Sequence, residues 1–408
     1  MSDDLERLRT KFASGALTHP RGSVPSIVDL AAAFWAASGV PGVVQSEAGH
    51  AMRERIGTPR HLVLVIADGL GLDLLESMPA ASFLWQHVSG EALTVFPSAT
   101  AAALTSLQTA RWPGEHGVIG HWMLGPRDIG VADILAFQRR SDRADLRTLG
   151  VEVGDIFGAP ALLGRSARST LFVLPERIVG SGFSDASGGG APQRGYRGLA
   201  DGVDVVLEHI RDAELRAAGG ETCTVLYVPR IDDAAHEHGP AHLEVVGEVR
   251  ALDREVQRLA IALAREDTRI VLTADHGHLP YPPSASRVMR GDDDVGRYLG
   301  IAPTGNDRVV YFHLERPEEG EAFAEAFRNR YGDLFVLLTP DEVIEAGLLG
   351  ETVTATTRQR MGDYVAISLG ADVLEFRPVG WRSEGRRVLR SQHSGLTAAE
   401  MRVPFIVI

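Results

Sequence analysis

The sequence predicts an α/β fold built on a central, mostly parallel sheet flanked by helices. Short apolar runs, typical of buried parallel strands, lie at 61–68, 170–175, 222–229 and 268–275. Helical patterns separate several of these runs, at 199–220 and 241–266. Because strands and helices alternate, we expect parallel crossovers rather than an all-β arrangement.

The remaining elements of the expected core follow from local composition. An amphipathic helix is predicted at 26–39, a second strand at 92–96 and a helix at 100–110. Residues 181–198 are rich in Gly and Ser and are predicted to form a surface loop. The final strand, 402–408, is expected to return to the main sheet.

The pattern changes after residue 280. Strand, helix, strand and helix follow one another at 308–315, 319–332, 333–339 and 340–350, which indicates a compact α+β insert. We therefore expect a small cap at 281–385. The main core would then comprise 59–280 and 386–408, with 1–58 as a helical segment packed on it.

Composition narrows the classes of function. The net charge of −13 disfavours a nucleic-acid partner, and Cys223, the single cysteine, excludes internal disulfides and cysteine-based zinc clusters. Lys11 is the single lysine and lies in a charged N-terminal stretch, which argues against Schiff-base and Walker-type chemistry. The N-terminus has no apolar signal-like region, and no apolar run reaches the ~18 residues that span a bilayer. We expect a cytoplasmic protein without a membrane partner.

Polar residues follow four of the expected strands. They are Asp68; Ser98 and Thr100; Asp232, Asp233, His236 and His238; and Asp275, His276 and His278. Since ligands of open α/β sheets bind beyond the carboxyl ends of the strands, these side chains should converge. Carboxylates and imidazoles together suit zinc, manganese or iron better than calcium. Either Ser98 or Thr100 could then be a nucleophile.

The spacing of these residues resembles the alkaline phosphatase superfamily. Within it, the closest likeness is to the type I nucleotide pyrophosphatase/phosphodiesterase branch and its phosphonoacetate hydrolase relatives. The likeness covers about 61–120, 222–280 and 392–408. The matching positions are Asp68-Gly69, Pro97 to Thr100, Thr109, Pro113, His116-Gly117, Asp232, His236, Gly239-Pro240, 274–277 and His393.

The resemblance implies a catalytic site. It selects Thr100 over Ser98 as the nucleophile of a phosphodiester or pyrophosphate hydrolase that works through a phospho-threonine intermediate. Two divalent ions are implied, most simply Zn²⁺ with Mn²⁺ as the alternative, placed about 4 Å apart to clamp the attacking and leaving oxygens. One ion would be held by Asp68, Thr100, Asp275 and His276, the other by Asp232, His236 and His393. His116 is expected to support a turn, and Asp233, His238 and His278 to lie around the ligands or on the surface.

Four departures leave the substrate open. Relatives place a phosphoryl-contacting Asn about 21 residues after the nucleophile, where this chain has His121, which we expect to bind substrate. Ala110 and Ser394 stand where Gly is common, and 229–232 also departs from the usual pattern. The alternatives are a phosphomonoesterase, a phosphonate hydrolase or a phosphomutase acting on a small phosphorylated substrate, and, further off, a non-catalytic metal-binding module. A sulfatase is disfavoured because its Cys/Ser-x-Pro-x-Arg signature is missing around Pro97.

Overall fold

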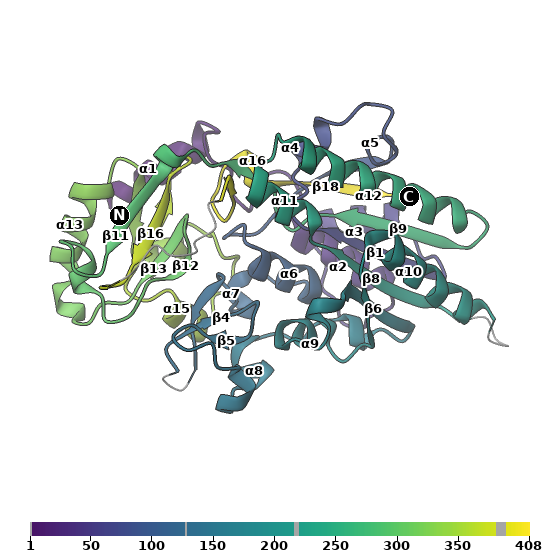
Figure 1. Cartoon of the computed structure of the whole chain (residues 1–408), viewed down its shortest axis with the longest axis horizontal. Helices are drawn as coiled ribbons and strands as arrows, with labels where there is room; N and C mark the ends of the chain where they lie inside the picture. Colours follow the sequence, from purple (N-terminus) through teal and green to yellow (C-terminus); the bar gives the residue numbers. More distant parts are fainter. Residues whose placement is uncertain (1, 127–128, 216–219, 381–388) are drawn as a thin grey trace.

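The computed structural model describes residues 2–126, 129–215, 220–380 and 389–408. Its two large sheets lie side by side along the length of the molecule (Figure 1). The main sheet and its helices occupy the right-hand part of that view, and the second sheet lies towards the left. The expected α/β class with a mostly parallel central sheet is confirmed.

The main sheet has seven strands in the order β2-β18-β9-β1-β8-β6-β7. Strands β9, β1, β8, β6 and β7 run parallel, whereas β18 is antiparallel to both β9 and β2. Every residue of β1 is buried, as an apolar run between two parallel neighbours requires. The bounds are β1 (His61–Ala67), β2 (Val88–Leu93), β6 (Ser169–Pro175), β7 (Gln193–Tyr196), β8 (Thr222–Val228), β9 (Thr268–Thr273) and β18 (Arg402–Val407).

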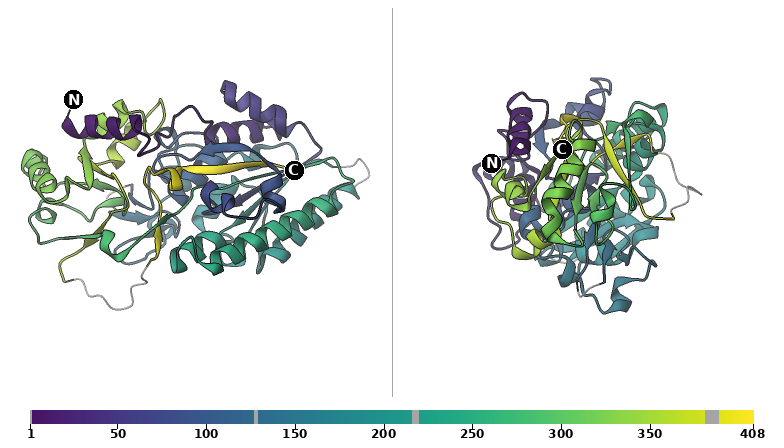
Figure 2. Two further views of the ribbon diagram at one scale, coloured as in Figure 1. Left: turned by 90° about the horizontal axis from the view of Figure 1, so that it is seen from above. Right: turned by 90° about the vertical axis from the view of Figure 1, so that its left-hand side faces the viewer.

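Helices cover both faces of this sheet. Figure 2 shows α2 (Ile27–Ala37) and α3 (Glu47–Ile56) on one face, and α10 (Leu199–Glu214) and α12 (Leu243–Ala262) on the other. Helix α2 begins at a capping box in which the Ser26 and Asp29 side chains each bond the other's main-chain N–H. It packs against α6 (Thr100–Thr109), so the main core is continuous beneath the expected site.

The second sheet is antiparallel, in the order β14-β15-β13-β12-β3-β4-β5. It extends beyond the expected cap range 281–385, because β3, β4 and β5 come from residues 122–139. Helix α1 (Asp3–Ala13) also packs here, against β14. The expected boundary at 385/386 falls outside the described residues. The strands are β3 (Trp122–Leu124), β4 (Val131–Asp133), β5 (Gln138–Arg139), β12 (Thr304–Asn306), β13 (Val309–Phe312), β14 (Phe335–Leu338) and β15 (Tyr364–Ser368).

The other elements are short, apart from one helix of the second sheet. The helices are α4 (Leu72–Glu76), α5 (Phe83–Gln86), α7 (Pro113–His116), α8 (Val153–Ile156), α9 (Gly182–Gly188), α11 (Arg230–His238), α13 (Gly320–Tyr331), α14 (Pro340–Glu345), α15 (Ala355–Arg360) and α16 (Ala398–Met401). Two small ladders pair β10 (Leu279–Pro280) with β17 (Ser391–Gln392) and β11 (Ser286–Arg290) with β16 (Val373–Arg377). Among the described helices, none is both long and apolar enough to cross a membrane.

Two local predictions were wrong. Residues 181–198 are not a surface loop, because they contain α9 and the edge strand β7. Ser181 caps α9, Phe183 is buried, and β7 pairs with β6, so tertiary contacts outweigh the Gly-rich composition. The strand expected at 92–96 ends at Leu93 and begins earlier, at Val88, where it pairs with β18.

Candidate active site and metal centre

The site lies beyond the carboxyl ends of three adjacent parallel strands. Asp68 directly follows β1, and Asp275 follows β9, its neighbour in the sheet. Asp232 lies on α11, two residues into the helix that follows β8, the other neighbour of β1. The sheet order therefore brings together carboxylates that are far apart in the sequence, as expected for an open α/β sheet.

The first group of donors surrounds His276. Its Nε2 atom is 3.1 Å from Thr100 Oγ1, 3.5 Å from Asp68 Oδ1 and 3.5 Å from Asp275 Oδ2. All four side chains are buried. Atoms that share a tetrahedral zinc ion at about 2.05 Å lie about 3.3 Å apart, so this spacing fits one ion.

The second group surrounds Asp232. Its Oδ1 atom is 3.3 Å from His236 Nε2, four residues along α11, and 3.9 Å from His393 Nε2. The His393 ring stacks on that of His276 at 3.7 Å, which joins the two groups. Among the described residues, three overlapping groups have donor atoms close enough together to hold a metal ion: Asp68, Asp275 and His276; Asp232, His276 and His393; and Asp232, His236 and His278. The structure thus brings together every residue that the sequence predicted as a ligand.

Main-chain carbonyls orient three of the imidazoles. The Nδ1 atoms of His236, His276 and His393 lie 3.0–3.1 Å from the carbonyl oxygens of Ser391, Gly277 and Ser98. A carbonyl only accepts, so each Nδ1 carries the proton and donates it. The Nε2 atoms, which face the carboxylates, then carry no proton and are available as metal ligands, an arrangement common around metal-bound histidines.

The site gathers three carboxylates, whose negative charges favour bound cations. Burial, together with repulsion from Asp275 and Asp232, raises the pKa of Asp68 well above its usual value. Burial and the neighbouring imidazoles of His276 and His236 lower the pKa of His393 well below its usual value, which favours the neutral ligand form. The Tyr227 hydroxyl donates to Asp68 Oδ2 and fixes that carboxylate.

Unsatisfied atoms mark the same place. Among the described residues, the buried side-chain atoms without a hydrogen bond include Asp68 Oδ1, Asp232 Oδ1 and Asp275 Oδ2. Such atoms are rare in folded proteins, and an ion bound between them would satisfy them. The donor set of imidazoles, carboxylates and a hydroxyl therefore fits divalent transition metals.

His278 lies closer to the ligands than sequence reasoning could establish. It is buried, and its Nε2 atom is 3.1 Å from Asp232 Oδ1. A Cβ added at Gly69, where φ is +76°, would lie 2.6 Å from that Nε2 atom, so this position needs glycine. Asp233 and His238 face outwards instead: Asp233 pairs with Arg177, and His238 lies near Glu237.

The two candidate hydroxyls differ in their contacts. Ser98 Oγ donates to the carbonyl of Gly395 at 2.7 Å and accepts the N–H of Ser394 at 3.1 Å. These two hydrogen bonds of Ser98 stabilise the loop that carries His393. Thr100, the first residue of α6, instead directs Oγ1 at His276.

His116 has the structural environment expected of it. It is fully buried, its Nε2 atom is 2.9 Å from Ser106 Oγ, and its Nδ1 atom accepts the N–H of Val118. Burial lowers its pKa to about 3, so the ring is neutral. Ala110 and Ser394, which stand where glycine is common, keep a backbone conformation that favours glycine, because their φ values are positive, 51° and 93°.

A cavity of about 310 Å³ opens at the site. Its lining includes Thr100 of α6, Asp232 and His236 of α11, and His393 after β17. On the side of the second sheet it includes Trp122 of β3 and Asn306 of β12, with the adjoining His121 and Asp307. His121 therefore lies in the same cavity as Thr100. Asn306 was not singled out from the sequence, where "GND" has only the pattern of a turn.

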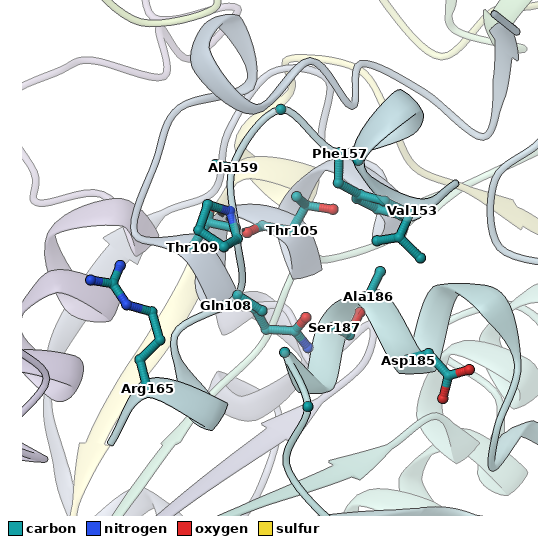
Figure 3. Close-up of a pocket in the computed structure, with 16 residues that line it drawn as sticks. Thr105, Gln108, Thr109, Val153, Phe157, Ala159, Arg165, Asp185, Ala186 and Ser187 are labelled. Carbon is teal, nitrogen blue, oxygen red and sulfur yellow. Dashed lines mark hydrogen bonds between the residues drawn. The ribbon is translucent and has the colours of Figure 1, made fainter. Parts of the chain in front are cut away.

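A larger cavity, of about 590 Å³, lies at the other end of α6. Figure 3 shows Thr105, Gln108 and Thr109 of α6 facing Phe157 and Ser187 across it. Its lining includes none of the predicted site residues, so its size does not make it the active site.

Comparison with known proteins agrees with this geometry. Residues 62–366 match the family model for Type I phosphodiesterase / nucleotide pyrophosphatase. Murine ectonucleotide pyrophosphatase / phosphodiesterase 5 is similar in structure, with a TM-score of 0.61 and 15% identity over 85% of this chain and 87% of that one. The human protein of that name gives 0.61 and 14% over the same shares.

A third similar structure is an inactive variant of the murine protein in complex with AMP, with a TM-score of 0.60 and 15% identity over 85% of this chain and 87% of that one. Comparison with curated proteins returned no match. At these identities the structural likeness shows the fold, whereas the family model covers most of the chain. The chain therefore belongs to the type I phosphodiesterase/nucleotide pyrophosphatase family, within the alkaline phosphatase superfamily.

Proposed function

We propose that this chain is a metal-dependent hydrolase that cleaves a phosphodiester or pyrophosphate bond in a small, nucleotide-type substrate. The observation that carries the proposal is the position of Thr100. Its hydroxyl is 3.1 Å from His276, within a buried group of carboxylates and imidazoles at the edge of an open cavity. Family membership supports the same class of reaction.

Two divalent metal ions complete the proposed site. Asp68, Asp275 and His276 would hold one together with Thr100, and Asp232, His236 and His393 would hold the other. Zinc suits these donors best, with manganese as the alternative. Bound at these positions, the ions would lower the pKa of the attacking hydroxyl and neutralise charge that develops on the phosphoryl group.

The chain's own residues then account for two displacement steps. Thr100 Oγ1 releases its proton and forms a bond to phosphorus, while the bond from phosphorus to the leaving oxygen breaks; that oxygen keeps the electron pair and takes up the released proton through solvent. A water oxygen next forms a bond to phosphorus and gives up a proton, while the bond from phosphorus to Thr100 Oγ1 breaks and Oγ1 takes up that proton. The first N–H groups of α6, beside Thr100, favour the anionic phosphoryl group throughout.

The substrate class comes from the family and from one relative. An inactive variant of the murine protein was solved in complex with AMP, and by analogy we propose a nucleotide-type substrate for this chain. The net charge of −13 disfavours polyanions such as nucleic acids, so the substrate is small. We also propose a cytoplasmic location, without a membrane partner.

Assays of the zinc- and manganese-loaded protein test this function. We expect about two metal ions per chain by elemental analysis and faster turnover of bis(4-nitrophenyl) phosphate than of 4-nitrophenyl phosphate, with loss of activity in a chelator. Preference for the monoester would favour a phosphomonoesterase or phosphomutase instead. Bound metal without any turnover would favour a non-catalytic metal-binding module.

A further inference from the structure

The second sheet reaches the active-site cavity through one tight turn. Gly305 of β12 pairs with Trp122 of β3 and has a φ of +91°. A Cβ added at Gly120 would lie 2.7 Å from the Cα atom of Gly305, so the two glycines let the two segments approach closely. The next residue after Gly305 is Asn306, and it lines the cavity that contains Thr100.

The Asn306 amide has a defined orientation. Its Oδ1 atom accepts the main-chain N–H of His121 at 3.1 Å. Since the oxygen is assigned by this hydrogen bond, Nδ2 forms the opposite end of the amide and carries two donors. Within the described ranges, no hydrogen bond uses Nδ2 as a donor.

The neighbouring polar groups are less suited to bind a phosphoryl oxygen. The His121 imidazole is directed at Asp133, with 3.5 Å between Nε2 and Oδ2. Asp307 also lines the cavity, but a carboxylate repels a phosphoryl group. The Asn306 amide is neutral and can only donate from its free end.

We propose that Asn306 donates an N–H to a non-bridging phosphoryl oxygen of the substrate bound at Thr100, and that His121 positions this amide through its main-chain N–H. The amide that the family resemblance places at position 121 is then supplied by the second sheet, from a residue 185 positions further along the chain. Asn306 is thus a phosphoryl-binding residue, and the second sheet completes the active site. This inference rests on the proposed function.

The test compares Asn306→Asp, Asn306→Ala and His121→Ala in the zinc-loaded full chain. Asn306→Asp keeps the side-chain volume and the acceptor for the His121 N–H but removes the donor. Asn329→Ala is the matched control, because Asn329 is the other asparagine of the chain and is exposed on α13. The readouts are kcat and KM for bis(4-nitrophenyl) phosphate, the Kd of orthovanadate, and zinc content.

We expect Asn306→Asp and Asn306→Ala each to lower kcat/KM by about 100-fold, the scale of one lost transition-state donor, and to weaken orthovanadate binding with zinc content unchanged. His121→Ala keeps the main-chain N–H and should lose far less. Wild-type kinetics and vanadate affinity in Asn306→Asp would overturn the inference, as would a loss confined to His121→Ala. Absence of turnover in the wild type would contradict the proposed function alone, and vanadate binding would still test Asn306.

Discussion

At the scale of the residue, Thr100 and Ser98 differ in what their hydroxyls already hold. Ser98 bonds two main-chain groups of the loop that carries His393, whereas Thr100 faces the carboxylates and His276. Two residues apart, Ser98 thus has a structural hydroxyl, and Thr100 has the hydroxyl that we propose as the nucleophile. The distinction rests on hydrogen bonding, since both side chains are buried.

Thr100→Ala should therefore lower kcat by at least about 1000-fold, because the bond to phosphorus cannot form. Zinc content should fall little, since Asp68, Asp275 and His276 remain. Ser98→Ala should retain turnover and lose about 1–2 kcal/mol of unfolding free energy through its broken hydrogen bonds. For both variants, steady-state kinetics measure kcat, elemental analysis measures the zinc content, and thermal melts measure the change in stability. A fully active Thr100→Ala protein would rule out the nucleophile.

At the scale of the element, helix α11 presents one face to the site and another to solvent. Asp232 and His236 are four residues apart, so one turn aligns them, and their donor atoms are 3.3 Å apart. His238 follows two residues later, on the outer face near Glu237. The same helix thus carries ligand candidates and an internal control.

His236→Ala and Asp232→Asn should each lower the bound metal from about two ions per chain to about one, and should reduce activity strongly. His238→Ala should keep both ions and wild-type turnover, because its side chain lies outside the site. Elemental analysis after dialysis distinguishes the variants. Equal metal loss in all three would mean that α11 supports the site as a whole and does not ligate.

At the scale of the whole molecule, a buried ion pair joins the two sheets. Arg308 precedes β13 of the second sheet, and its Nε atom donates to Glu400 Oε1 at 2.7 Å, with both side chains fully buried. Glu400, on α16 before β18, also accepts the N–H of Gly395, two residues after His393. The pair therefore links the second sheet to the loop that places His393.

Arg308→Leu should lower the free energy of unfolding by about 3–5 kcal/mol, because it leaves the Glu400 carboxylate buried without a cation. The half-buried pair of Arg287 and Asp372 is the control, and Arg287→Leu should cost less than about 1 kcal/mol, because water still reaches both side chains. Denaturant unfolding measures both. If Arg308→Leu does not fold, the double variant Arg308→Leu/Glu400→Leu should recover soluble protein; equal stabilities of the two single variants would refute the argument.

The sequence by itself determined the fold class and the metal-ligand candidates. The fold class and the strand-end candidates depend on short-range patterns: apolar runs that need burial, followed by polar residues, as in the segments that deliver Asp68 and Asp275. The choice of Thr100 and the inclusion of His393 depended on the resemblance to the family. The ends of parallel strands were therefore expected to bring these residues together, and the strand order β9-β1-β8 places them side by side. The spacing of Asp232 and His236 likewise needs only the helical repeat.

Only the tertiary structure decided the rest of the site and the second sheet. Asn306 meets His121 through a strand pairing between segments far apart in the chain, and no local pattern records such a pairing. His278 could be a surface residue until packing buries it beside Asp232. Residues 182–188 and 193–196 form regular structure because neighbouring elements cover them, although their composition favours a loop. In each case, burial and strand pairing between distant segments stabilise the observed conformation. Local helix and strand propensities are too weak to outweigh these contacts.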